Sequence, residues 1–353
     1  MTLFLQAFCV AFGFGFLIFT HELGHFIAAK ICKVKILTFA FGFGPSLLKC
    51  SYKGTKYSIN LLPFGGFVAM AGENHENATG LKGEYLSLEW YKKVLISFAG
   101  PFSNYILAIL LFTLIFSIWG VVTPAIEPII GEIVANYPAA ISGLKHGDKI
   151  KSIDSVEINT WDDLNNNLKN KINKTTSFVI ERDNYSFNLN MVVAKNPITD
   201  MGTIGINPLK TKPKIHKAIY FAIKTSIFQT VSSVKYLVNK IRTLEKPEIS
   251  GPLGIIQIMG NATKAGAQNY LKLIAVISIA LGLFNLFPIP MVDGGMIILF
   301  LIEGLIKKRI SIKTIQVYNI TGLIFIICIF FLVTLNDLVK LGIINKIKFF
   351  FNL

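Results

Sequence analysis

The chain has 353 residues, of which 52% are hydrophobic and only 16% are charged. Soluble proteins usually have about 25% charged residues, so this composition indicates several membrane-spanning segments, with the lipid bilayer as a partner. The net charge of +15 could suggest nucleic-acid binding, but no zinc finger, recognition helix or aromatic RNA-binding signature accompanies it, and we expect no nucleic acid partner. Lysines beside apolar spans explain the excess, because anionic lipid headgroups attract them.

Four apolar runs are long enough to cross a hydrocarbon core about 30 Å thick. They predict transmembrane helices at about residues 3–29, 94–119, 273–302 and 314–336. The first two belong to an N-terminal membrane half, residues 1–122, and the last two to a C-terminal membrane half, residues 271–353.

Basic residues gather at one side of these runs. They follow the first run, precede the second and separate the third from the fourth: Lys30, Lys33 and Lys35; Lys92 and Lys93; Lys307, Lys308, Arg309 and Lys313. This side is therefore predicted to be cytoplasmic, so that both termini and the long region between the second and third runs face outward. Lysines near the C-terminus, Lys340, Lys346 and Lys348, depart from the pattern.

The segment at about 39–70 is too apolar for an ordinary cytoplasmic loop. It alternates apolar residues with aromatics and glycine pairs, as in FGFGPSLL and YSINLLPFGGFVAM, and this alternation predicts a β-hairpin. Strand backbone is tolerated at membrane depth only where it is buried in protein or lines a wet cavity. We therefore predict a re-entrant hairpin beside a polar site.

Residues 123–212 differ in character from the rest of the chain. Short strand-like runs such as DKIKSID and FNLNMVV, separated by polar turns and one helical stretch, predict a small soluble α+β domain. The next segment, 213–270, begins with apolar residues at helical spacing and lysines on the other face. That pattern is typical of an interfacial helix lying on the membrane surface, followed by a connector. A helix packed on the soluble domain is the alternative.

The first predicted span ends in the sequence His21-Glu22-Leu23-Gly24-His25. Residues four apart lie on one face of a helix, so the two imidazoles can reach the same metal ion. Zinc binds histidine nitrogens, and a catalytic zinc has three protein ligands and one open position. The carboxylate of Glu22 lies beside the pair, where it can take a proton from an attacking water. The motif therefore predicts a Zn²⁺ site with Glu22 as general base.

A third ligand is needed, and Asp293 is the best candidate. It lies in NLFPIPMVDGG, and no other charge occurs between Leu273 and Ile302. A buried carboxylate without a partner would be protonated or excluded, and a zinc ion explains why it is there. Asn285, in the same motif, could hydrogen-bond the backbone of a substrate; a polar contact between helices is the alternative.

Three motifs, HELGH, LLPFGGFVAM and NLFPIPMVDGG, follow one another in this order along the chain. Together they resemble the site-2 protease family of intramembrane zinc metalloproteases, and within it the bacterial regulator-of-sigma-E proteases. AGPFSN at residues 99–104 is similar to the segment that opens the second core helix of that family. PAAISGLKHGDKIKSID at residues 138–154 is similar to the ligand loop and strand of a PDZ domain.

The resemblance implies a polytopic α-helical membrane protein with about four transmembrane helices, a membrane re-entrant β-hairpin and an inserted α+β PDZ-like domain. It implies that His21, His25 and Asp293 are the zinc ligands. It also implies that Glu22 is the catalytic base and that Asn285 binds substrate. Gly65 and Gly66 would belong to the hairpin, which would pair with an unwound substrate as an added strand.

The implied activity is hydrolysis of peptide bonds in or near transmembrane segments of single-pass membrane proteins, of the anti-sigma factor or remnant signal peptide type, in regulated intramembrane proteolysis. The implied location is the bacterial inner membrane, with the termini and one PDZ-like domain outside the cytoplasm. The best-known relative has two PDZ domains in tandem, whereas this chain has room for one.

Two other hypotheses compete with this activity. The chain could be a catalytically inactive, membrane-anchored PDZ binding protein with a structural metal site, but such a site has no use for the general base that Glu22 provides. It could also be a metal transporter, but the sequence lacks repeated halves. The enzyme hypothesis explains more of the motifs.

Overall fold

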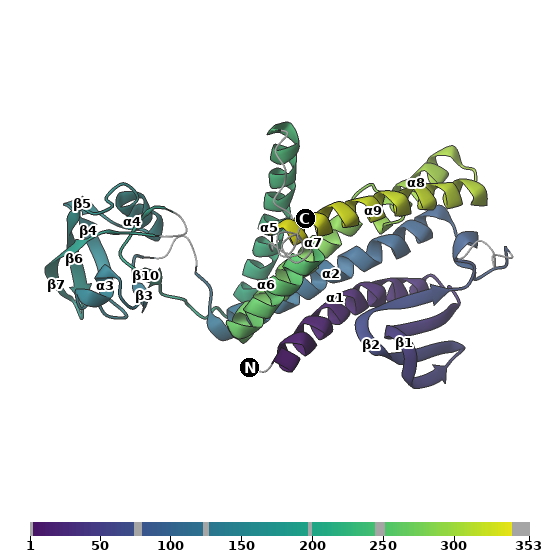
Figure 1. The fold of residues 1–353 in the computed structure, drawn as a ribbon, viewed down its shortest axis with the longest axis horizontal. Helices are drawn as coiled ribbons and strands as arrows, with labels where there is room; N and C mark the ends of the chain where they lie inside the picture. The colour runs from purple at the N-terminus through teal and green to yellow at the C-terminus, as the bar shows by residue number, and fades with distance from the viewer. Residues whose placement is uncertain (1–2, 74–79, 123–126, 197–199, 244–250, 341–353) are drawn as a thin grey trace, which may run out of the picture. The chain divides into compact units, whose positions relative to one another are not determined.

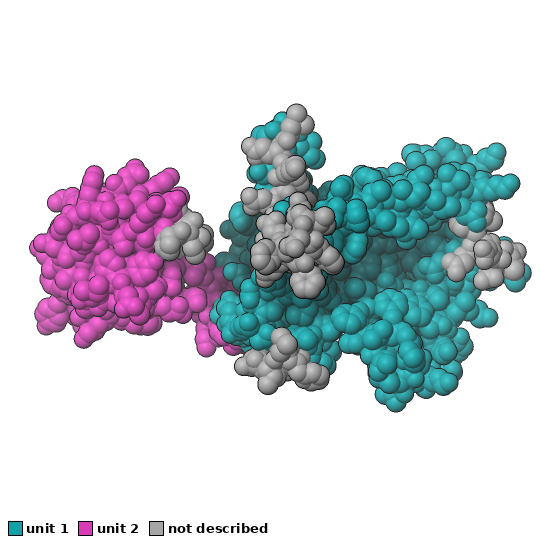
Figure 2. All heavy atoms as spheres, viewed as in Figure 1, with its two compact units in different colours: residues 1–115, 218–353 teal, residues 116–217 magenta. Residues whose placement is uncertain are grey.

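The computed structural model describes residues 3–73, 80–122, 127–196, 200–243 and 251–340. Within them the chain forms two compact units, which Figure 2 shows in different colours. One unit combines residues 1–115 with 218–353, and the other contains residues 116–217. All four predicted segments lie partly outside the described residues: 1–2 and 74–79 of 1–122, 123–126 and 197–199 of 123–212, 244–250 in the connector of 213–270, and 341–353 of 271–353.

The first unit is built from long apolar helices (Figure 1). Among the described residues, four helices are long and apolar enough to cross a membrane: Gln6–Ile31 within α1 (Leu3–Ile31), α2 (Trp90–Trp119), α7 (Ala267–Asn285) and Lys313–Val339 within α9 (Ile312–Lys340). The prediction of about four transmembrane helices is confirmed at this level. Two shorter helices join them, α6 (Pro252–Lys264), which contacts α1, α7 and α9, and α8 (Asp293–Ile306).

The third predicted span, 273–302, is not one helix. It is divided between α7 and α8, and the break contains Pro288 and Pro290, which have no amide hydrogen to continue a helical ladder. Met291 in the same break has a left-handed backbone, with φ of 76°. Asp293 is therefore the first residue of α8 and follows directly after the break. It does not lie in the middle of a transmembrane helix.

The predicted hairpin segment forms β1 (Ile36–Tyr52) and β2 (Thr55–Met70), which lie beside α1 (Figure 1). Its pairing is more complex than a flat hairpin. Residues 38–41 have partners on both sides, since Phe39 is paired with Val68 and also with Tyr57. The two long strands therefore curl into a sheet in which 38–41 is central. Residues 66–70 pair on one side only within the described part of the chain, and form an edge of this sheet.

The second unit has a hydrophobic core of its own, which includes Ile150, Leu164 and Phe178. Its main sheet has the order β5 (Val156–Glu157), β4 (Lys149–Ile153), β6 (Thr175–Arg182) and β7 (Tyr185–Val192). Four short strands pair outside that sheet, β3 (Ile130–Ile133) with β10 (Ile206–Pro208) and β8 (Ala194–Lys195) with β9 (Gly202–Thr203). The helices are α3 (Pro138–Ile141) and α4 (Trp161–Leu168), and a capping box at Thr160 starts α4. This is an α+β unit.

The amphipathic segment forms helix α5 (Ile215–Thr243). Its buried side chains share one face: Ala218, Ala222 and Ser226. One turn further, the Thr230 hydroxyl donates a hydrogen bond to the hydroxyl of Tyr105 in α2 at 3.3 Å. Large apolar side chains such as Phe228 remain exposed. The helix therefore touches α2 at Tyr105 and keeps an apolar face that the interfacial prediction would direct toward lipid.

Candidate metal centre and catalytic cavity

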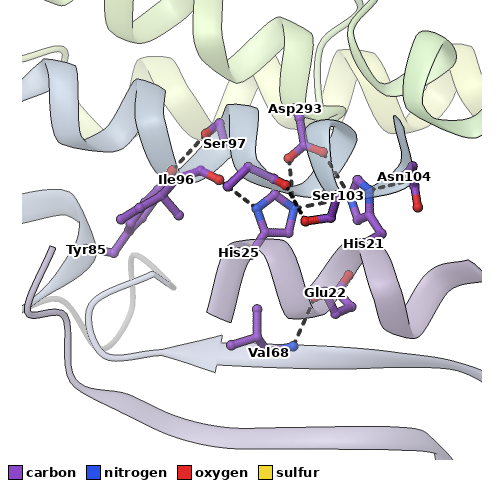
Figure 3. Close-up of polar contacts among 11 residues, drawn as sticks. His21, Glu22, His25, Val68, Tyr85, Ile96, Ser97, Ser103, Asn104 and Asp293 are labelled. Carbon is purple, nitrogen blue, oxygen red and sulfur yellow. Dashed lines mark hydrogen bonds and ion pairs between the residues drawn. The ribbon is translucent and has the colours of Figure 1, made fainter. Parts of the chain in front are cut away.

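The two histidines of the HELGH motif lie near the end of α1 and turn toward Asp293 (Figure 3). Both are 8% exposed, and their Nε2 atoms lie 3.1 Å apart. The carboxylate oxygens of Asp293 lie 3.0 Å from His21 Nε2 and 3.4 Å from His25 Nε2. Within the described part of the chain, these three residues form the group whose ligand atoms, all within 4.8 Å of one another, could hold a metal ion.

Helix α2 contacts the other nitrogen of each imidazole. His25 Nδ1 lies 2.8 Å from the carbonyl oxygen of Ile96, and His21 Nδ1 lies 3.2 Å from the side-chain amide of Asn104. The Asn104 oxygen has no hydrogen-bond partner among the described residues, and a half-turn of the amide would let this oxygen accept from His21 Nδ1–H. With protons on both Nδ1 atoms, both Nε2 atoms keep a lone pair for a metal ion.

Glycines allow α2 to approach α1 this closely. A Cβ atom at Gly100 would lie 2.3 Å from His25 Nε2 and 2.9 Å from His21 Cε1. On the facing helix, a Cβ atom at Gly24 would lie 2.2 Å from the carbonyl oxygen of Ala99. Small residues of this kind are typical where two membrane helices pack backbone to backbone. This packing explains why a glycine stands within the AGPFSN segment.

Gly100→Ala is expected to weaken zinc binding roughly tenfold or more, because the added methyl group meets the ring atom that would ligate the metal. Zinc retained by the purified protein against a competing chelator measures the effect. Gly260→Ala in α6 is the matched control, since a Cβ atom there meets nothing within 4 Å. Equal retention by Gly100→Ala and the wild type would mean that the two helices can separate without disturbing the imidazoles.

Glu22 contacts the edge of the sheet (Figure 3). Its Oε2 atom accepts a hydrogen bond from the backbone amide of Val68 at 3.1 Å. Because Val68 belongs to the edge segment 66–70, this bond joins α1 to the sheet. Glu22 also lines the same cavity as His21, His25 and Asp293. The predicted base and the predicted metal ligands therefore share one space.

Close packing fixes the turn that carries Asp293. A Cβ atom at Gly295 would lie 2.0 Å from the carbonyl oxygen of Ile289, so the DGG sequence lets the start of α8 fold back against the turn. Tyr318 of α9 donates a hydrogen bond to the carbonyl oxygen of Gly295 at 3.1 Å. The carboxylate is thus positioned by its own glycines and by a neighbouring helix.

The cavity has a volume of about 440 Å³. Besides the four residues named above, its wall contains Asn285 at the end of α7 and Val68 and Met70 of the sheet edge. The structure therefore brings Asn285 to the same space as the predicted ligands and base.

Gly65 and Gly66 are not among the residues that line this cavity. A Cβ atom at Gly65 would lie 2.9 Å from the Phe43 ring, and one at Gly66 would lie 2.6 Å from the carbonyl oxygen of Ala40. Gly65 also has a φ of 106°, a conformation that favours glycine. Both glycines thus shape the sheet beside the cavity.

Several polar residues near the site escaped the sequence reasoning, among them Asn104, Tyr85 and Asn319. Asn104 had a signal, because it closes the AGPFSN segment, but no role was assigned to it. Tyr85 and Asn319 line the cavity through tertiary packing alone. The Tyr85 hydroxyl lies 3.1 Å from Ser97 Oγ. Burial raises the pKa of Tyr85 well above its usual range, although the hydrogen bond with Ser97 offsets part of the effect, so this phenol stays protonated.

Comparison with known proteins gives matches along most of the chain. The sequence model of Peptidase family M50 matches residues 9–329 of this chain. A protein of Clostridium acetobutylicum, named provisionally as a zinc metalloprotease, is 33% identical over 92% of this chain and 95% of its own. A Campylobacter jejuni protein with a name of the same form is 32% identical over 93% of this chain and 91% of its own length. A protein of Enterococcus faecalis, named provisionally as the protease Eep, is 28% identical over 92% of this chain and 96% of its own length.

Among solved structures, the PDZ domain of an SdrC-like protein from Listeria monocytogenes is similar to part of this chain. It is 17% identical, and the match covers 25% of this chain and 90% of the domain, with a TM-score of 0.21.

Proposed function

Since this chain belongs to Peptidase family M50 and is a zinc metalloprotease of a membrane, we propose that it hydrolyses peptide bonds in or near the transmembrane segments of single-pass membrane proteins. One observation carries the proposal. Three converging ligand atoms and the carboxylate of Glu22 share a cavity among helices that are apolar enough to lie in a bilayer. Ionisable groups in such helices are costly unless they serve a function.

The donor set fits Zn²⁺, and we propose that His21, His25 and Asp293 are its ligands. Two imidazoles and one carboxylate are a ligand set of catalytic zinc sites, whereas structural sites usually have four protein ligands. The described residues bring together three. When bound, zinc lowers the pKa of water and polarises a carbonyl group. A site with three ligands favours the enzyme over the inactive binding protein.

Glu22 is the proposed general base. Its carboxylate would take the proton of the attacking water and later give it to the leaving amine nitrogen. The hydrogen bond from the Val68 amide, 3.1 Å long, holds this carboxylate at the edge of the sheet. The base and the strand that would receive substrate are therefore joined by one contact.

The edge segment 66–70 is the proposed binding place for unwound substrate. A transmembrane helix hides its peptide bonds in its own hydrogen bonds, so it must open before cleavage, and an edge strand can satisfy the freed groups. The amides of Val68 and Met70 point away from the sheet, because they donate to Glu22 at 3.1 Å and to Glu73 at 3.0 Å. Both residues line the cavity. A substrate strand at this edge would lie next to the base.

Asn285 would add a further hydrogen bond to the substrate backbone, since its side chain lines the same cavity. Gly65 and Gly66 would act indirectly. Their close contacts with Phe43 and Ala40 leave no room for a side chain, and they set the path of the strand that ends in the edge segment.

The proposed orientation follows the lysines: the basic side faces the cytoplasm, and the termini and the PDZ-like region 123–212 lie outside, in a bacterial inner membrane. A folded unit outside the membrane could contact the outer part of a single-pass substrate before cleavage. Anti-sigma factors and remnant signal peptides are substrates of the required form. Cleavage of either would make this protein part of regulated intramembrane proteolysis.

The test is cleavage of a model single-pass protein by the purified enzyme in lipid vesicles. Activity should disappear when a chelator removes zinc and return when zinc is added back. Mass spectrometry should place the new ends within or beside the transmembrane segment, and substrates with helix-breaking residues there should be cut faster. Zinc binding without any cleavage would support the inactive binding protein, and cleavage that survives zinc removal would contradict the proposed chemistry.

A further inference from the structure

One face of α9 packs against the catalytic cavity. Ile315 and Asn319 line the cavity, and Tyr318 between them hydrogen-bonds the carbonyl oxygen of Gly295. Residues four apart share a helix face, so Ile315 and Asn319 turn to the cavity together, and the hydrogen bond of Tyr318 holds this part of α9 against the start of α8. None of the site residues that the sequence predicts belongs to this helix.

Asn319 is an unusual residue for its surroundings. The most apolar 18-residue stretch of the candidate span Lys313–Val339 has a mean hydropathy of 2.5, the highest value among the four candidate spans. The Oδ1 atom of Asn319 is buried and has no hydrogen-bond partner among the described residues. A buried amide oxygen left unpaired in such a place costs free energy. A contact between helices would explain an asparagine here, but the described neighbours supply none for this oxygen.

We propose that Asn319 is a substrate-binding residue whose carboxamide hydrogen-bonds a backbone peptide group of the unwound substrate; this inference rests on the proposed function. A carboxamide has one donor group and one acceptor, as a peptide group does, so the two are complementary. The edge segment 66–70 would satisfy some of the freed backbone groups, and Asn319 would satisfy another from a different element. Because every unwound segment offers such groups, this contact does not depend on the substrate side chains.

The test compares Asn319→Ala, Asn319→Leu and Asn319→Gln with the wild type on the same model single-pass substrate. Loss of one hydrogen bond is expected to raise KM about tenfold in the first two variants, with kcat and zinc content nearly unchanged. Asn319→Gln keeps the chemistry and should recover part of the affinity. Gln316→Ala is the matched control, because Gln316 is an exposed residue on the same helix, and it should behave as the wild type.

A second measurement does not depend on turnover. In a Glu22→Gln background, affinity for a fluorescent form of this substrate should fall by a similar factor when Asn319 is replaced by alanine. Unchanged affinity, or a loss that follows zinc content or thermal stability, would overturn the assignment. If the wild type cleaves the substrate and the Asn319 variants bind it equally well, only this inference is refuted. A wild type that cleaves nothing refutes the proposed function, and the binding measurement still tests Asn319.

Discussion

Glu22→Gln is expected to lower cleavage by roughly 100- to 10,000-fold while zinc content and stability stay unchanged. Glutamine has nearly the size of glutamate, and its amide oxygen can still accept the hydrogen bond that the Val68 amide makes to Glu22 at 3.1 Å. The contact between α1 and the sheet edge therefore survives. Only the ability to accept a proton from water is lost, so the effect should fall on kcat.

A second carboxylate provides a matched comparison for this variant. Glu73 lines the same cavity and accepts a hydrogen bond from the next outward-facing amide of the edge segment, that of Met70, at 3.0 Å. It does not belong to the HELGH motif. Glu73→Gln should therefore lose much less activity than Glu22→Gln.

Rates of the two variants in lipid vesicles, corrected for zinc content, measure the difference. Comparable turnover in Glu22→Gln and the wild type would show that Glu22 is not the base. A large loss in Glu73→Gln alone would move that role to the second carboxylate.

Local rules explain why the sequence could single out the three proposed zinc ligands, which the structure brings together. His21 and His25 need only the periodicity of one helix to face the same ion, and the structure brings their Nε2 atoms within 3.1 Å. Asp293 was found from the cost of an isolated charge in an apolar run. The helix breaks before Asp293, where Pro288 and Pro290 indicated a break. A turn and a new helix, α8, follow this break, so the third membrane-spanning helix is α7 alone.

Residues that reach the site through tertiary packing could not be predicted in this way. Gly100 and Asn104 lie opposite α1 because two helices far apart in sequence pack together, and Asn319 faces the cavity because α9 packs on the turn before α8. The alternation in 39–70 indicated strands correctly, but it did not reveal that Phe39 has partners on both sides. Strand periodicity specifies the faces of a strand and says nothing of its neighbours.

Asp293→Ala is expected to lose most of the zinc, with an affinity decrease larger than the roughly 10- to 100-fold that removal of an outer-shell partner costs. Its carboxylate oxygens contact both histidine Nε2 atoms, at 3.0 and 3.4 Å, so alanine would remove the proposed third ligand and leave two imidazoles. Asp293→Asn keeps the shape and one oxygen but not the charge, and should bind zinc with intermediate affinity. Zinc per chain, measured after equilibration with a competing chelator, ranks the three proteins.

A structural role for Asp293 would give a different result, because the same contacts could serve as a simple His–Asp pair that holds α8 against α1. Asp337 is the control for that role, since it is a buried carboxylate that accepts the amides of Gly251 and Gly254 at 2.9 Å. Asp337→Ala should lower thermal stability and keep zinc binding, whereas Asp293→Ala should lose zinc first. Full zinc retention in Asp293→Ala would refute its assignment as a ligand, and equal zinc loss in both variants would mean that the fold, not the ligand, had been removed.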